Sequence, residues 1–183
     1  MKIPIETSNR HVHLSKKDLE ILFGENYSLT LARKLSQPGE FAAEEKVILV
    51  HDGKKIENVR VLGPLRNRTQ IELLSKDAST LGISPKTKNS GDHEDTPGIE
   101  IIGPNGKIKK ENGVIVANRH LHITEEEAEL LKIKEKIISL KVKDKILDNV
   151  AVRINSNSKL AVHINKDDDF AKHIDLNTHG ELV

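Results

Sequence analysis

Two His-x-His motifs are the part of this sequence best suited to chemistry: His11 with His13, and His120 with His122. On a β-strand, residues i and i+2 lie on the same face, about 6.6 Å apart at Cα. Two imidazoles placed in this way can bind one metal ion, with ring nitrogens about 2.0–2.1 Å from zinc. A single motif of this kind is more often incidental, so its meaning depends on what accompanies it.

Both motifs belong to an internal repeat. Residues 8–14 read SNRHVHL, and residues 117–123 read ANRHLHI, 109 residues further on. A second match has an offset of 91 and aligns VILVHDGKKIENVRV at 47–61 with ISLKVKDKILDNVAV at 138–152. The change in offset places an 18-residue insertion in the first copy, somewhere between residues 24 and 46. We therefore interpret the chain as an internal duplication of one unit.

The repeat adds a third candidate ligand to each motif. At the offset of 91, QIEL at 70–73 aligns with AVHI at 161–164, which matches Glu72 with His163. A set of three ligands leaves a position for solvent or substrate, as in catalytic zinc sites. If the two copies pack about a pseudo-two-fold axis, the two sets face each other and the metal site lies between the domains. The candidate metal ligands are His11, His13, Glu72, His120, His122 and His163.

An alternative interpretation is that duplication copied a structural histidine pair. That interpretation does not account for Glu72 and His163 at equivalent positions. The other four histidines have no counterpart in the other copy. We expect them to be surface or loop residues: His51, His93, His173 and His179.

The arginines divide into matched and unmatched residues. Arg10 and Arg119 precede the two motifs in both copies, and on a strand they point away from the adjacent histidine. A structural ion pair is as good an interpretation for these two arginines as a role in the metal or substrate site. Arg66 has no equivalent in the second copy and lies six residues before Glu72, with Arg68 four before it. Because guanidinium binds phosphate through two parallel hydrogen bonds, Arg66 is the candidate phosphate or oxyanion clamp.

Short helices and strands must position these residues. Ser15 with Asp18, and Thr124 with Glu127, are capping-box patterns that predict a helix after each motif. Further helices are expected at 75–82 and 165–174. Most other segments are short β-branched runs separated by turn residues such as Asp52-Gly53, which favours small barrels or a sandwich. The Pro-, Gly-, Ser- and Asp-rich stretch at 84–98 is expected to connect the copies.

Composition excludes several classes of function. There is no cysteine, which excludes disulfides, thiolate metal sites and a cysteine nucleophile. A formal net charge of +1 and 2% aromatic residues argue against nucleic acid as a partner. No apolar run approaches the length of a membrane span, and the first residues lack the apolar core of a signal peptide. We expect a cytoplasmic protein with no membrane partner.

Four stretches resemble one known family. The chain is similar to the propanediol-utilisation (PduL-type) phosphate acyltransferases over nearly its whole length. The matching stretches are SNRHVHL at 8–14, LSQPGEFAAEE at 35–45, NVRVLGP at 58–64 and NRHLH at 118–122.

The resemblance implies an enzyme that interconverts acyl-CoA plus phosphate with acyl phosphate plus CoA, with acetyl or propanoyl as the acyl group. It implies two divalent metal ions, normally zinc, on the six ligands named above, and it gives Arg66 the phosphate-binding role. It also implies a mostly β fold of two similar six-stranded β-barrels with short helices. Residues 10–117 would form the first barrel, and residues 118–183 with the N-terminal strand 1–9 the second.

Several finer expectations accompany the resemblance. Family members housed in bacterial microcompartments carry an N-terminal targeting extension that is not visible before the first strand here, which favours a free cytoplasmic member. We expect a homodimer. The insertion either shapes the CoA channel or a subunit contact, or is simply a structural loop and helix. With no cysteine nucleophile or serine triad in the sequence, phosphate is expected to attack the thioester directly.

Two rival functions remain open from the sequence. A binuclear metal hydrolase, such as a thioesterase or phosphatase, would use the same ligands. A non-enzymatic metal-binding β-barrel protein would bind metal without turnover. CoA release from acyl-CoA that depends on phosphate distinguishes the acyltransferase from both.

Overall fold

The computed structural model describes all 183 residues. The chain divides into two compact units. We call Arg10–Val116 the N-unit, and Met1–Asn9 with Ala117–Val183 the C-unit. None of the helices has both the length and the apolar character needed to cross a membrane.

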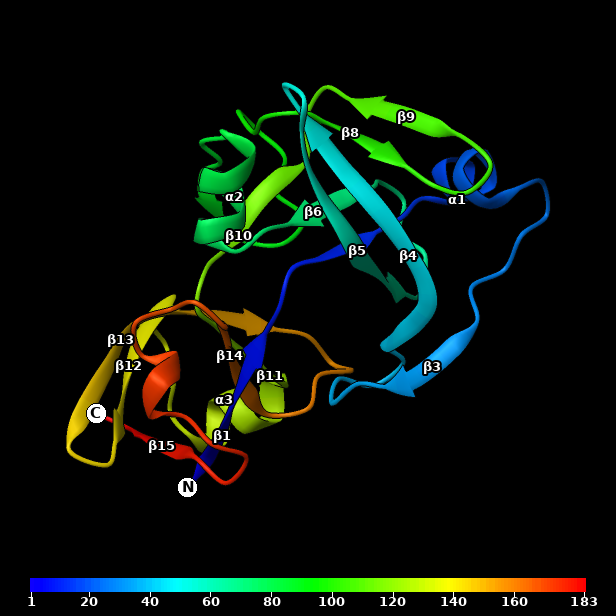
Figure 1. The fold of residues 1–183 in the computed structure, drawn as a ribbon. Helices are drawn as coiled ribbons and strands as arrows, with labels where there is room; N and C mark the ends of the chain where they lie inside the picture. The colour runs from blue at the N-terminus through cyan, green and yellow to red at the C-terminus, as the bar shows by residue number, and fades with distance from the viewer. The chain divides into compact units, whose positions relative to one another are not determined.

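The C-unit is a closed six-stranded barrel in the order β1-β14-β11-β13-β12-β15. Alternate residues of its strands point inward and form an aliphatic core that includes Ile3, Leu121 and Val162, all fully buried. The 3₁₀ turn η1 and one helix, α3, lie outside the barrel strands (Figure 1). The elements are β1 (Ile3–Ser8), β11 (His120–Ile123), α3 (Glu125–Leu130), β12 (Ile137–Val142), β13 (Lys145–Ile154), β14 (Ala161–Asn165), η1 (Ala171–His173) and β15 (His179–Leu182).

The N-unit is a nine-stranded sheet in the order β7-β10-β6-β2-β5-β4-β8-β9, with β3 paired to β4. The long β4–β5 hairpin, cyan to teal in Figure 1, turns at Asp52 and Gly53, which both have the positive φ of a tight hairpin turn. The elements are β2 (His11–His13), α1 (Lys16–Phe23), β3 (Leu31–Lys34), β4 (Phe41–His51), β5 (Lys54–Gly63), β6 (Gln70–Glu72), α2 (Ser75–Leu81), β7 (Thr87–Lys88), β8 (Ile99–Ile102), β9 (Lys107–Lys110) and β10 (Val114–Ala117).

The mostly β prediction is confirmed, and the six-stranded barrel is found in the C-unit. The N-unit differs from that expectation because its sheet stays open. In the C-unit, β15 pairs with both β12 and β1 and so closes the barrel. In the N-unit, β8 pairs with β4 on one side and with β9 on the other, which extends the sheet.

The strand that precedes each His-x-His motif in sequence pairs within the other unit, next to the strand that carries that unit's third candidate ligand. β1 precedes His11 in sequence but pairs with β14 of the C-unit. β10 precedes His120 but pairs with β6 of the N-unit. The crossover of the N-terminal strand that the resemblance implied is therefore accompanied by a second, reciprocal one.

Both units share a local irregularity. The β4–β5 ladder shifts register between Val47 and Leu49, and the β12–β13 ladder shifts between Ile138 and Leu140, at the matching positions 91 residues later. Asn58 and Asn149, also 91 apart, both have positive φ. The same frame thus surrounds the two His-x-His strands, since β5 and β13 are their parallel neighbours.

Three of the four predicted helices form. Ser15 caps α1 by accepting from the Asp18 amide, and Thr124 with Glu127 makes a complete capping box on α3. The expected helix at 165–174 is wrong, because only the 3₁₀ turn Ala171–His173 forms there. Asp168 is the cause: its carboxylate accepts from the Phe170 amide and binds Arg119, which holds the chain in a turn.

Two further segments lie differently from our expectation. The stretch 84–98 lies inside the N-unit, where it includes β7. The insertion in the first copy forms no helix after α1; it forms β3 and the start of β4. Phe41, at the start of β4, lies against Gly63, where any side chain would collide with the Phe41 ring.

Candidate metal-binding and active site

In both units the candidate ligands lie on the sheet face opposite the aliphatic core. Val12 in β2 and Leu14 just after it belong to the core, so His11 and His13 point to the other face. In β11, Leu121 and Ile123 are the core residues and the two histidines alternate with them. The strand pleat therefore presents each histidine pair on one outer face.

The N-unit cluster brings His11, His13 and Glu72 together. β2 and β6 are antiparallel with His11 directly opposite Glu72. The Nε2 atoms of His11 and His13 lie 3.4 and 3.9 Å from the two Glu72 oxygens. Ligand atoms placed about 2.0–2.1 Å from a tetrahedral zinc ion are about 3.3 Å apart, so the observed separations are close to those of a three-ligand set.

The C-unit cluster brings His120, His122 and His163 together in the same way. His120 lies opposite His163 in the β11–β14 ladder, and its Nε2 is 3.1 Å from that of His122. His120 Nδ1 is 2.7 Å from the Asn118 carbonyl and donates to it, which leaves the Nε2 lone pair facing the cluster. His163 Nε2 is buried and makes no hydrogen bond.

In each cluster the environment lowers the pKa of one imidazole, which favours the neutral form that binds metal. Burial, followed by the nearby His120 and His163, lowers the pKa of His122 to about 3. Burial, followed by His11 and Arg66, holds the pKa of His13 well below its ordinary value. Burial alone would raise the pKa of Glu72, but His11, His13 and Arg66 outweigh it and keep this carboxylate ionised.

These two donor sets fit a divalent transition metal. The ligand atoms of each set lie within 4.8 Å of one another. Imidazole and carboxylate donors suit zinc, whereas calcium and magnesium require sets dominated by oxygen. The buried, unbonded His163 Nε2 supports the same conclusion, because a buried polar atom without a partner is costly unless something else binds it.

Arg66 lies at the N-unit cluster. After burial and His11, it is the next cause of the lowered pKa of His13. Its guanidinium donates to Ser90 Oγ at 2.9 Å and lies 3.8 Å from a Glu40 oxygen. Arg68 instead donates to Asn112 Oδ1 at 3.2 Å.

Gln70 is a residue of this site that we did not identify from the sequence. Its Nε2 donates to Glu72 Oε1 and to Ser90 Oγ, both at 2.7 Å. Its Oε1 accepts from the Gly91 amide at 2.7 Å and lies 3.1 Å from His93 Nε2. Every hydrogen-bonding group of this buried amide is used to hold the candidate ligand Glu72 against the 84–98 stretch.

The signal for Gln70 was present in the repeat. Its counterpart 91 residues later is Ala161, so Gln70 is unmatched in the same sense as Arg66. His93 corrects our expectation of a surface residue, because it is buried and bonded to Gln70. Of the other three histidines, His179 is exposed and the other two are partly exposed, in line with that expectation.

Arg10 and Arg119 make ion pairs that match across the repeat. Arg10 Nη1 lies 2.7 Å from Asp77, just inside α2. Arg119 binds Asp168 through two nitrogens at 2.8 and 2.9 Å. Asp77 and Asp168 are themselves 91 residues apart. The two arginines therefore fasten the His-x-His strand to the segment that follows the third ligand, which is a structural role.

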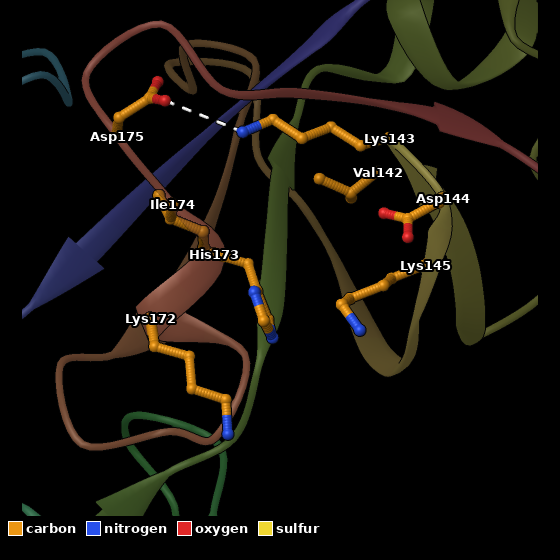
Figure 2. Close-up of a pocket in the computed structure, with 8 residues that line it drawn as sticks. All are labelled: Val142, Lys143, Asp144, Lys145, Lys172, His173, Ile174 and Asp175. Carbon is orange, nitrogen blue, oxygen red and sulfur yellow. Dashed lines mark ion pairs between the residues drawn. The ribbon is translucent and has the colours of Figure 1, made fainter.

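A separate hollow in the C-unit holds none of the candidate ligands. Figure 2 shows it between the β12–β13 turn and residues 172–175, which form the end of η1 and the segment just after it. Three lysines line it, Lys143, Lys145 and Lys172, and Lys143 lies 3.7 Å from Asp175. The ligand clusters thus lie on sheet faces and not in this hollow.

Residues 4–175 match the family model of phosphate propanoyltransferase. A phosphate propanoyltransferase of Thermotoga maritima is 48% identical over 99% of this chain and 87% of its own length. Proteins of the same name from Alkaliphilus metalliredigens and Clostridioides difficile are 38% and 42% identical, over 100% and 91% of this chain and 88% and 81% of their own lengths.

Proposed function

The chain belongs to the phosphate propanoyltransferase family and is an acyltransferase. We propose that it moves a short acyl group, acetyl or propanoyl, between coenzyme A and phosphate with the help of two metal ions. The observation that carries the proposal is the N-unit cluster, where three ligand side chains and an unmatched arginine lie together. Phosphate and acyl-CoA are the substrates in one direction, and acyl phosphate and CoA in the other.

Each unit would hold one ion. His11, His13 and Glu72 fit the N-unit ion, and His120, His122 and His163 the C-unit ion. Zinc is the metal that these donors favour. When bound, such an ion supplies Lewis-acid stabilisation to the phosphate and to the developing oxyanion.

Arg66 would bind the phosphate. The Arg66 side chain is partly exposed, and Ser90 and Glu40 orient its guanidinium. A phosphate oxygen attacks the thioester carbonyl carbon, a C–O bond forms, and the C–S bond breaks. The CoA sulfur leaves with the electron pair and takes a proton. Arg66 neutralises charge on the phosphate and orients it for this attack.

The transfer would proceed without an acyl-enzyme. The chain has no cysteine, and Ser90 Oγ serves as a hydrogen-bond partner of Arg66 and Gln70. Both substrates must then be bound together, which gives ternary-complex kinetics with intersecting double-reciprocal lines. Parallel lines, or an isolated acyl-enzyme, would contradict direct attack. The homodimer and the cytoplasmic location expected from the sequence stay predictions.

The test is CoA release from acetyl-CoA and from propanoyl-CoA, each with and without phosphate and with and without a chelator. The proposal expects release only with phosphate, loss on chelation, and recovery when zinc is added back. Release without phosphate would indicate a thioesterase. Bound metal without release from either thioester would indicate a non-enzymatic metal-binding protein.

A further inference from the structure

A carboxylate from the first strand of the chain lies beside the C-unit cluster. β1 and β14 pair so that Glu6 lies opposite His163. β14 and β11 pair so that His163 lies opposite His120. Three adjacent strands therefore carry Glu6, His163 and His120 in one row, on the face that points away from the barrel core.

The contact joins atoms that would both face an ion. Glu6 Oε2 lies 3.2 Å from His163 Nε2, the nitrogen that is buried without a hydrogen bond. Two ligands of one zinc ion lie about 3.3 Å apart. A carboxylate that only oriented the ring would bond to the other nitrogen, Nδ1, as partners of metal-bound histidines do. Glu6 is therefore placed as a fellow ligand of His163.

Charge supports the same assignment. Three neutral imidazoles would leave a divalent ion with its full +2 charge at a partly buried site, which is costly. In the N-unit, Glu72 reduces the corresponding charge to +1. Glu6 would do the same in the C-unit, and with 40% of its side chain exposed it has room to adjust toward the ion.

Building on the two-metal function above, we propose that Glu6 is the fourth protein ligand of the C-unit ion, which is then held by three imidazoles and one carboxylate. The N-unit has no equivalent ligand. The position 109 residues after Glu6 is Ile115, which lies opposite Glu72 and cannot bind a metal. In the resting protein, the C-unit ion would have four protein ligands and the N-unit ion three. The N-unit ion keeps an open position, and the C-unit ion takes substrate only as a fifth ligand.

The test isolates the C-unit cluster in the full chain with a His11→Ala/His13→Ala background. Zinc affinity is measured by competition with a chromogenic chelator, and coordination by the visible absorption of bound Co²⁺. Glu6→Gln is expected to weaken zinc binding by at least about 100-fold, because residues that only orient a metal ligand already contribute 10–100-fold. The Co²⁺ bands should shift as the carboxylate leaves the ion.

Glu181→Gln is the matched control, because it removes the same charge from an exposed position on β15 of the same barrel. It should leave zinc affinity and the Co²⁺ bands unchanged. In the chain without the alanine substitutions, Glu6→Gln should lower the tightly held zinc from two equivalents to one, while the far-UV circular dichroism of the metal-free protein stays the same.

The outcomes separate this proposal from the proposed function. If Glu6→Gln binds zinc as tightly as its parent with unchanged Co²⁺ bands, Glu6 is not a ligand, and the two-metal transferase stands without it. If the parent chain binds no metal at all, both proposals fail.

Discussion

The N-unit and C-unit clusters are built on the same three-strand frame but differ in the residues that occupy it. Across β10, β6 and β2 the row reads Ile115, Glu72, His11. Across β1, β14 and β11 it reads Glu6, His163, His120. In the N-unit the carboxylate lies on the middle strand, whereas in the C-unit it lies on a flanking strand and the middle strand carries an imidazole.

The surroundings differ more than the frame. The N-unit cluster is supported by Gln70 and Arg66, neither of which has a counterpart in the C-unit. Matched residues such as Arg10 and Arg119 make structural ion pairs instead. The repeat therefore specifies where the candidate ligands lie, and the clusters differ in the unmatched residues Gln70 and Arg66 around them.

The largest expected effect comes from removing one imidazole from each cluster in turn. His13→Ala and His122→Ala should each lose one equivalent of zinc and keep the other, because the three ligands of each cluster lie within one unit. Each should also lose at least about 10³-fold in kcat/KM, more than the loss of one oxyanion-hole donor. Elemental analysis and CoA release measure both effects. A variant that loses both ions at once would show that the clusters do not bind independently.

Arg66→Ala tests the residue that most separates the two clusters. If Arg66 clamps phosphate, the variant should keep its fold and zinc content but lose roughly 10²–10³-fold in kcat/KM for phosphate. Arg66→Lys should recover only part of that loss, because a point charge lacks the planar fork. Steady-state kinetics with phosphate varied gives the answer.

Arg68 is the control for this experiment, since it bonds to Asn112. Arg68→Ala should change kcat/KM for phosphate by only a few-fold. If Arg68→Ala abolished turnover while Arg66→Ala kept it, the clamp would be the neighbouring arginine.

Sequence reasoning went furthest where the repeat provided a second copy to compare. The mostly β fold and the caps of α1 and α3 follow from local patterns. The open N-unit sheet did not follow from the sequence, because it depends on the second partner of one strand. In the C-unit β15 pairs with the distant β1 and closes the barrel, whereas in the N-unit β8 pairs with its neighbour β9. The roles of Gln70 and His93 were not predicted, because they arise from a long-range contact with the 84–98 stretch, whose composition is typical of a linker.

Gln70→Ala should have an intermediate effect confined to the N-unit cluster. Without its amide, Glu72 loses a buried donor at 2.7 Å and the 84–98 loop loses its anchor. Zinc affinity of the N-unit cluster should fall by roughly 10–100-fold, as for other partners that orient a ligand. The C-unit cluster, with Ala161 at the matching position, is the control within the same molecule. Equal weakening of both sites in a chelator competition would refute a local role.

The smallest effect distinguishes the two capping acids, Asp18 and Glu127, which are 109 residues apart. Glu127 completes the capping box of α3, where Gln serves as well, so Glu127→Gln should change the free energy of unfolding by about 0.5 kcal/mol or less. Asp18 instead turns inward, where it accepts from Thr69 and from Lys110 Nζ at 2.8 Å. Asp18→Asn leaves Lys110 without that charge and should cost about 1–3 kcal/mol in urea unfolding at neutral pH.

The loss of unfolding free energy caused by Asp18→Asn should depend on pH in a definite direction. Burial alone would raise the pKa of Asp18, but hydrogen bonds from Lys110 and Thr69 outweigh burial and lower it from the ordinary value of 3.8. A carboxylate with a lowered pKa stabilises the fold at all pH values above its unfolded pKa, and that stabilisation is lost as the pH falls through the lower, folded value. The gap between the parent and Asp18→Asn should therefore stay constant from neutral pH down to about 4 and shrink below it. A gap for Asp18→Asn that persisted well below pH 3 would mean that packing, and not charge, is what Asp18 contributes.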